Sequence, residues 1–454
     1  FQAEDGIRDV ERSRGLGDVY KRQDKNRRFI MNIIKLLIIS LTVVITSLSV
    51  RAIDLEFYFP VAVGGGAAQA IEKFAEDYTK LNPDVNVKAV FTGSYTDTDT
   101  KFLTACKSGT APATSVMIAV TIFKYIDEEC VMAWDDILTQ DEIDNWIGGF
   151  YPAFMANGQV DGKTYGIPFQ RSTPVLYYNK DAFRAAGLDP ENPPKTWDEQ
   201  LEVAKKLTIK DSDGNVSQYG IRIPSAGFPY WLFSAIVYGN GGKIMNDNGT
   251  ETYINSPEAI EALEKLVALS TTEGVMRPGI LEWGSTPQAF FEGQTAMMWT
   301  TTGNLTNVRN NAPFDWGVAF IPGIKQFGAP VGGGNFYLSI DTTEEEQQAT
   351  KDFVKWITEP KQSVAWTKAT GYVAPRAETW ESDEMKEFLK EFPYPAVARD
   401  QLEYAGPEFS TYEQPKTVSI FNRALEAAVA GEKDPKTALL EAHAEIDKIL
   451  KDYR

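Results

Sequence analysis

Arg171 is the residue of this sequence whose side chain could most directly recognise a charged ligand. It stands just before a strand-like apolar run, PVLYYN at residues 174–179, in a chain rich in acidic residues. A guanidinium can grip a phosphate or carboxylate through two parallel hydrogen bonds. It can equally pair with one of the many acidic side chains, and the sequence leaves these two roles open.

An aromatic group at Phe228, Tyr230 and Trp231 could bind ligand in another way. The C–H-rich face of a polyol or sugar packs on a flat apolar ring that has hydrogen-bond donors around it. Aromatic side chains also belong to cores. Of the three, we expect Trp231 to contact the ligand, followed by Tyr230.

Catalytic and metal-binding signatures are missing from the sequence. It holds one histidine, His443, and two cysteines, Cys106 and Cys130. With one histidine, which lies in a C-terminal helical pattern, and two cysteines, the usual zinc sites and Ser–His–Asp or Cys–His machinery are not expected. We therefore expect no enzymatic activity, no cofactor and no metal. The two cysteines could form a disulfide, but their spacing does not test the required geometry.

The elements that must position these residues alternate between strand and helix. Leu55, Phe57 and Phe59 alternate with other residues as in a half-buried strand, residues 71–81 have a helical apolar face, and VNVKAVF at 85–91 is a second strand. Strand, helix and strand with a short return predict a parallel unit and an α/β fold. Tyr95 follows the second strand, where open α/β sheets place ligand loops.

The first 52 residues read as a leader. Residues 1–30 are highly charged and we exclude them from the fold. Residues 31–52 have a basic start, an apolar run and a small-residue cut site after Ala52, which predicts a secretory signal peptide. The net charge of −18 becomes about −22 without residues 1–52, and so acidic a surface disfavours nucleic acid as a partner.

Three consecutive motifs carry a resemblance to a known family: TPVLYYNKDAF at 173–183, GLDP at 187–190 and PPKTW at 193–197. They resemble the extracellular solute-binding proteins of carbohydrate-type ABC importers, most of all the branch that carries glycerol-3-phosphate. The resemblance implies a two-lobed periplasmic-binding-protein fold, type II-like, with three crossings between the lobes.

We place these crossings near residues 169–173, 299–302 and 339–342. Lobe one is then expected at residues 53–169 plus 300–340, and lobe two at 170–299 plus 341–454.

The resemblance also implies ligand contacts in separate motifs. The branch has ligand-contacting residues at the positions of Tyr95 in FTGSYTDT, Ser172, Thr301 in GQTAMMWTTTGN, Gly333 in APVGGGNFYLS and Tyr372 in TKATGYVAPR. Only glycine lets a backbone approach a ligand this closely.

Two departures change what the pocket can hold. This chain has Ala119 where the branch has a glutamate that binds glycerol hydroxyls, and Val418 where it has an arginine that grips phosphate. Arg171 and Lys416 are the candidate substitutes for that arginine.

The resemblance predicts a monomeric periplasmic protein that closes its lobes on a small polyol phosphate or sugar and delivers it to the transmembrane subunits of an ABC permease. Glycerol-3-phosphate or a related glycerophosphodiester is the expected ligand, and a neutral sugar or oligosaccharide is the alternative. A secreted glycoside hydrolase would need two carboxylates facing one cleft, and no Asp or Glu falls at a ligand-contact position of these motifs.

Overall fold

The computed structural model describes residues 27, 29–35, 52–64 and 66–454. The elements discussed here lie in residues 53–454, which form one compact unit. The leader and signal peptide predicted for residues 1–52 fall largely outside the described residues. None of the described helices is long and apolar enough to cross a membrane.

The first sheet begins as the sequence predicts. β1 and β2 are parallel and are joined by helix α2 (Ala67–Leu81), and Leu55, Phe57 and Phe59 are fully buried. β14 runs antiparallel to β3, β4 and β7. The strands of this sheet are β2 (Val85–Phe91), β1 (Ile53–Phe59), β3 (Thr114–Ile118), β14 (Gly332–Ser339), β4 (Val131–Met132) and, also beside β14, β7 (Gly166–Ser172).

Two helices from the second half of the chain complete the core of this sheet. They are α13 (Glu344–Ile357) and α14 (Pro360–Thr370). Phe353 of α13 packs against Phe57 and Phe336, with ring centroids 5.4 and 6.3 Å apart. Burial of such rings stabilises the sheet on this face.

A second, antiparallel sheet has the predicted PVLYYN strand at its centre. β8 (Pro174–Asn179) lies between β11 (Met297–Thr301) and β12 (Trp316–Ala319). The six residues of β8 are all buried. The helix after it, α8 (Trp197–Leu207), starts with the predicted capping box of Thr196 and Glu199.

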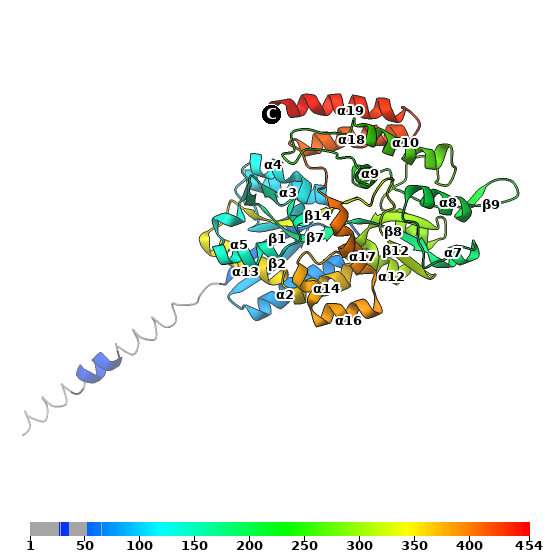
Figure 1. Ribbon diagram of the computed structural model, residues 1–454. Helices are drawn as coiled ribbons and strands as arrows, with labels where there is room; N and C mark the ends of the chain where they lie inside the picture. The colour runs from blue at the N-terminus through cyan, green and yellow to red at the C-terminus, as the bar shows by residue number, and fades with distance from the viewer. Residues whose placement is uncertain (1–26, 28, 36–51, 65) are drawn as a thin grey trace, which may run out of the picture. The chain divides into compact units, whose positions relative to one another are not determined.

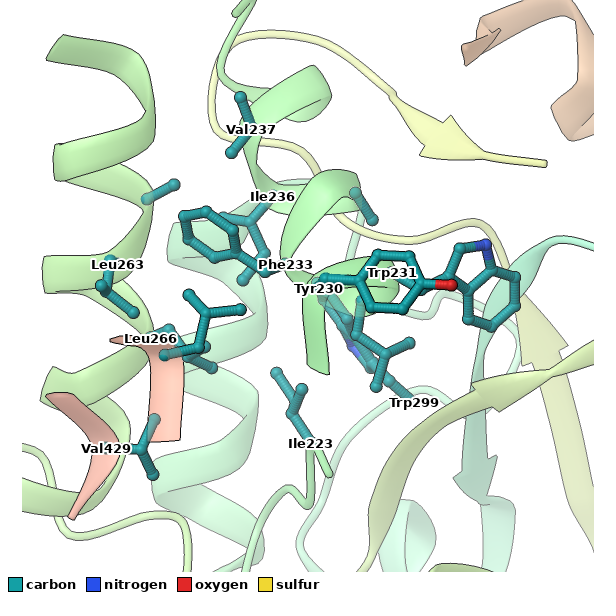
Figure 2. Close-up of a cluster of buried hydrophobic side chains, with 14 of the residues drawn as sticks. Ile223, Tyr230, Trp231, Phe233, Ile236, Val237, Leu263, Leu266, Trp299 and Val429 are labelled. Carbon is teal, nitrogen blue, oxygen red and sulfur yellow. The ribbon is translucent and has the colours of Figure 1, made fainter. Parts of the chain in front are cut away.

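A helical layer covers the second core. Figure 1 shows α10 (Pro257–Thr271), α18 (Gln414–Val429) and α19 (Pro435–Leu450) next to one another, and they contact each other. α9 (Pro229–Gly239) lies beneath them and is buried along its whole length. In Figure 2, Phe233 and Ile236 of α9 lie toward Leu263 of α10, whereas Tyr230 and Trp231 lie apart from that contact.

The packing bears on the lobe boundaries expected from the sequence, which stay a prediction. Residues 169–172 belong to β7, and Thr173 links β7 to β8. Residues 300–340 include β12, which returns to pair with β8 of the second sheet before the chain enters β14. Residues 341–454 include α13 and α14, whose apolar faces pack on the first sheet.

Cys106 and Cys130 form a disulfide, with their Cα atoms 5.7 Å apart. It ties α3 (Tyr95–Lys107) to the segment before β4.

The remaining α-helices and β-strands are short connecting elements. They are α4 (Ile122–Asp127), α5 (Gln140–Asn145), α6 (Pro152–Met155), β5 (Gln159–Val160), β6 (Lys163–Thr164), α7 (Lys180–Ala185), β9 (Ile209–Lys210), β10 (Val216–Gln218), α11 (Thr286–Phe291), α12 (Leu305–Asn311), β13 (Ala329–Pro330), α15 (Ala377–Glu381), α16 (Asp383–Glu391), α17 (Tyr394–Gln401) and β15 (Ala405–Gly406).

Candidate functional site

A small cavity lies where β7, β11 and β14 meet the starts of α3 and α9. Its volume is about 40 Å³. It is lined by Ala62, Val63, Tyr95, Ile118, Ser172, Phe228, Trp231, Trp283, Thr301, Gly333, Tyr372 and Glu408. Six of the nine residues expected to contact a ligand are among these, although they come from six separate segments of the chain. Their contact with a ligand stays a prediction.

Two buried tyrosines form one wall of the cavity. Tyr95 is the first residue of α3, and its hydroxyl donates a 2.8 Å hydrogen bond to Gln170 Oε1. Tyr372 stacks on Trp366 with ring centroids 5.5 Å apart and planes 5° apart. Burial raises the pKa of Tyr95 well above its usual value and that of Tyr372 to about 12. Both phenols therefore stay neutral hydrogen-bonding groups at physiological pH.

The glycines of β14 fit the expectation of a close backbone approach, but the approach is to protein atoms. Gly333 has φ +106°, and a Cβ there would collide with the carbonyl oxygen of Gln170. A Cβ on Gly332 would lie 2.6 Å from Trp231 Nε1. A side chain at either position would therefore displace β7 or the Trp231 indole from the cavity.

Aromatic rings form the opposite wall. The Trp231 indole donates a 2.8 Å hydrogen bond to the carbonyl of Val331, which fixes its orientation. Trp283 meets Trp231 nearly edge-on at 6.0 Å and Phe228 at 5.2 Å between ring centroids. Tyr230 lines a neighbouring cleft instead, and its hydroxyl points to Glu408.

The two cations expected to hold a phosphate are not among the residues that line the cavity. Arg171 is fully buried beneath it, with Nη1 3.3 Å from Asn335 Oδ1 and its guanidinium over the ring of Phe154. Lys416 lies in the first turn of α18, its side chain 65% exposed and in a 2.8 Å ion pair with Glu413. The solvated position of Lys416 and the burial of Arg171 explain why neither faces the cavity.

A carboxylate that the sequence motifs did not identify lines the cavity. Glu408 is 2% exposed, and its Oε1 accepts a 2.6 Å hydrogen bond from the Tyr230 hydroxyl. Its Oε2 has no partner among the described residues. Burial raises the pKa of Glu408 to about 7, although the Tyr230 hydrogen bond, the positive charge of Arg171 and the Gly333 amide oppose this.

A larger cleft of about 920 Å³ adjoins the cavity between α3, α9 and α18. The two spaces share Ala62, Tyr95, Ile118 and Phe228 as lining residues. Asp99 lines the cleft, and burial raises the pKa of its carboxyl to about 7.

The two sequence departures fall at different depths. Val418 also lines the cleft, in place of the arginine expected in the glycerol-3-phosphate branch. Ala119 is fully buried in a short 3₁₀ turn.

Comparison with known proteins identifies the family. The sequence profile of the bacterial extracellular solute-binding proteins matches residues 71–390. The chain belongs to this family. The sn-glycerol-3-phosphate-binding periplasmic protein UgpB of Yersinia pseudotuberculosis is 26% identical to this solute-binding protein over 417 residues, which are 88% of this chain and 93% of UgpB. UgpB of Salmonella typhimurium is 26% identical over 393 residues, which are 83% and 88% of the two chains.

Solved structures of similar fold bind different solutes. UgpB from Mycobacterium tuberculosis in complex with glycerophosphocholine has a TM-score of 0.76 at 21% identity and covers 88% of this chain and 98% of its own. The cyclic alpha-maltosyl-1,6-maltose binding protein from Arthrobacter globiformis has a TM-score of 0.75 at 24% identity and covers 88% and 100%. These likenesses show that this solute-binding protein has the two-domain fold of periplasmic solute-binding proteins.

Sequence reasoning missed Glu408 and Trp283 for a common reason. Each lies in an irregular segment with no motif of its own, AGPEFS and LEWGS respectively. The local signals were a Trp followed by Gly284 and a Glu preceded by Pro407, and such residues are common in loops. Only the folded chain brings Glu408 to Tyr230, which is 178 positions away in the sequence.

Proposed function

We propose that this protein captures a neutral carbohydrate and delivers it to an ABC permease, without making or breaking a bond. The observation that carries this choice is the charge of the lining of the small cavity, whose volume of about 40 Å³ admits only one edge of a sugar, the rest of which would occupy the adjoining cleft. Among the described lining residues, Glu408 is the only ionisable acid or base other than tyrosine. The rest are aromatic rings, hydroxyls, small apolar residues and Gly333, which suit the apolar faces and hydroxyl edges of a sugar.

A phosphate would be poorly accommodated at this position. A phosphate charge about 5 Å from an ionised Glu408 is opposed by about 3 kcal/mol at an effective dielectric constant of ~20. Three cations line the adjoining cleft: Lys107 is paired with Glu128 at 2.8 Å and Arg423 with Glu445 at 3.3 Å, whereas Lys124 has no ion pair within 4.0 Å among the described residues. A phosphorylated ligand would compete with these pairs.

Glycerol-3-phosphate or a glycerophosphodiester is the second candidate, supported by the names of the relatives. The lining of the larger cleft departs from that branch at Val418. The glycoside hydrolase alternative gains the two carboxylates Asp99 and Glu408 in adjoining spaces, but the family's members are binding proteins. Export to the periplasm, a monomeric state and closure of the lobes complete the proposal.

A thermal-shift panel tests this proposal on residues 53–454. Maltose, mannotriose and tagatose represent neutral sugars, and glycerol-3-phosphate and glycerophosphocholine represent the second candidate. We expect at least one neutral sugar to raise the melting temperature, because a ligand that binds only the folded state stabilises it by mass action. A shift from the phosphate compounds alone would refute the carbohydrate proposal, and release of free sugar from a bound glycoside would revive the hydrolase.

A further inference from the structure

Glu408 presents one free carboxylate oxygen to the cavity. Oε1 is held by Tyr230, while Oε2 is buried and no described residue meets hydrogen-bond geometry with it, although the Gly333 amide lies near enough to lower the pKa of the carboxyl. Buried polar atoms in folded proteins nearly always have a hydrogen-bond partner, and exceptions call for an explanation. A ligand donor reaching into the cavity would supply the missing partner.

The backbone of Glu408 is held in a way that fixes this oxygen. Its amide donates to Asn157 Oδ1 at 2.9 Å, and its carbonyl accepts from Asn157 Nδ2 at 3.1 Å. Asn335 Nδ2 in turn donates to the Asn157 carbonyl at 3.0 Å, and Arg171 donates to Asn335. These bonds hold the backbone of Glu408 and the Tyr230 hydroxyl holds Oε1, so that binding a donor costs little ordering of the side chain.

Glu408 is surrounded by one cationic group and several phenols, and its carboxyl is the acid of the cavity that titrates near neutral pH. Arg171 lies on the β7 side and lowers the pKa of its carboxyl, but no ion pair within 4.0 Å joins the two among the described residues, and Arg171 Nε and Nη2 likewise have no hydrogen-bond partner there. The phenols that face Glu408 are Tyr95 on α3, Tyr230 and Tyr238 on α9 and Tyr337 on β14, and burial raises the pKa of each. These phenols stay neutral near pH 7, so the charge of the site changes there only through carboxyl groups.

We propose that Glu408 is the specificity-determining residue of this site: its Oε2 accepts a hydrogen bond from a hydroxyl of the bound solute and its charge excludes phosphorylated solutes. The inference rests on the proposed carbohydrate function and adds the residue that enforces it. A glutamate that merely balances the buried charge of Arg171 would affect folding stability without affecting the choice of ligand.

The first test compares Glu408→Gln with wild type, using the neutral sugar that gives the largest thermal shift and glycerol-3-phosphate as probes. Hydrogen bonds to a charged acceptor contribute more than those to a neutral amide, so we expect the sugar affinity of Glu408→Gln to fall by about ten- to a hundredfold. The affinity for glycerol-3-phosphate divided by the affinity for the sugar should be higher in Glu408→Gln than in the wild type. Glu403→Gln, an exposed glutamate in the same segment, is the matched control and should leave both affinities unchanged.

A second test does not depend on that variant folding. Because the ionised form of Glu408 is the better acceptor, sugar affinity of the wild type should fall as the pH drops from 8 to 6, by up to about tenfold for one group with a pKa near 7. Tyr230→Phe removes the hydroxyl that stabilises the ionised carboxylate and should move the midpoint of this profile to higher pH. Asp99, whose pKa is also raised to about 7, lines the adjoining cleft, so the midpoint shift is the readout that assigns the profile to Glu408.

The outcomes separate this inference from the proposed function. Sugar binding that is equally tight in Glu408→Gln, or a pH midpoint unmoved by Tyr230→Phe, would overturn the role of Glu408 and leave the carbohydrate function standing. Wild-type protein that binds glycerol-3-phosphate more tightly than every sugar, or binds no sugar, would overturn both.

Discussion

Replacing Trp283 by alanine should weaken ligand binding with only a moderate loss of stability. Trp283 is half-buried, lines the cavity and contacts Trp231 and Phe228 nearly edge-on. Each such aromatic pair contributes about 0.5–1.5 kcal/mol, so their loss lowers the free energy of unfolding by about 1–3 kcal/mol. In the wild type, stacking of a sugar face on the Trp283 indole should contribute ~1–2 kcal/mol to binding. Loss of this contact in Trp283→Ala should raise the Kd about five- to thirtyfold.

Two further variants, Trp231→Ala and Trp356→Ala, serve as comparisons for this prediction. Trp231 is 4% exposed and belongs to the second core, so its removal should cost about 3–5 kcal/mol of stability and cannot report on binding alone. Trp356 is also half-buried but packs on Phe74 and Tyr78 of α2, away from the cavity lining. Calorimetric titration of the three variants gives the Kd of each, and urea unfolding gives the free energy of unfolding of each. An unchanged Kd for Trp283→Ala, or an equal loss for Trp356→Ala, would refute the assignment of this wall.

Two further predictions concern stability. The Cys106–Cys130 disulfide closes a chain segment with a sequence separation of 24, so the double Cys→Ser variant should unfold with a free energy lower by about 3 kcal/mol, measured by urea denaturation, and an equal stability would contradict this. Burial tends to raise the pKa of Glu142, but hydrogen bonds from Thr139 and the charge of Lys351, 3.3 Å away, outweigh it and lower that pKa to about 2 from its usual 4.5. Because the pKa of Glu142 is lower in the folded than in the unfolded state, the ionised carboxylate stabilises the fold fully above about pH 5, and this stabilisation is lost as the pH falls toward 2. Glu142→Gln should therefore make the free energy of unfolding less dependent on pH between these values.

The local elements of the fold could be predicted from the sequence where short-range chemistry decides them. The strand at β8 and the capping box at Thr196 depend on residues within a few positions of each other, and the structure has both. The return of β12 to β8 could not be predicted, because it depends on pairing between segments about 140 positions apart. Cys106 and Cys130 were compatible with a disulfide, but the folded chain was needed to place them together.

The candidate site shows the same division between local and distant information. Tyr95, Ser172, Gly333 and Tyr372 lie in motifs that resemble the family's, and the structure gathers them around one cavity. The sequence left the role of Arg171 open, and in the structure Arg171 lies fully buried in β7, beside β14, and is not among the residues that line the cavity. Burial and side-chain direction are properties of the packed chain, and no spacing of residue types encodes them.

The most direct test of the account is a calorimetric competition on residues 53–454. The protein is first titrated with the neutral sugar selected by the thermal-shift panel, and the complex is then titrated with glycerol-3-phosphate. Glu408 is the one carboxyl group among the described residues that line the cavity, and this predicts a defined Kd for the sugar and no displacement by glycerol-3-phosphate at equal concentration. Complete displacement of the sugar by glycerol-3-phosphate would contradict the account.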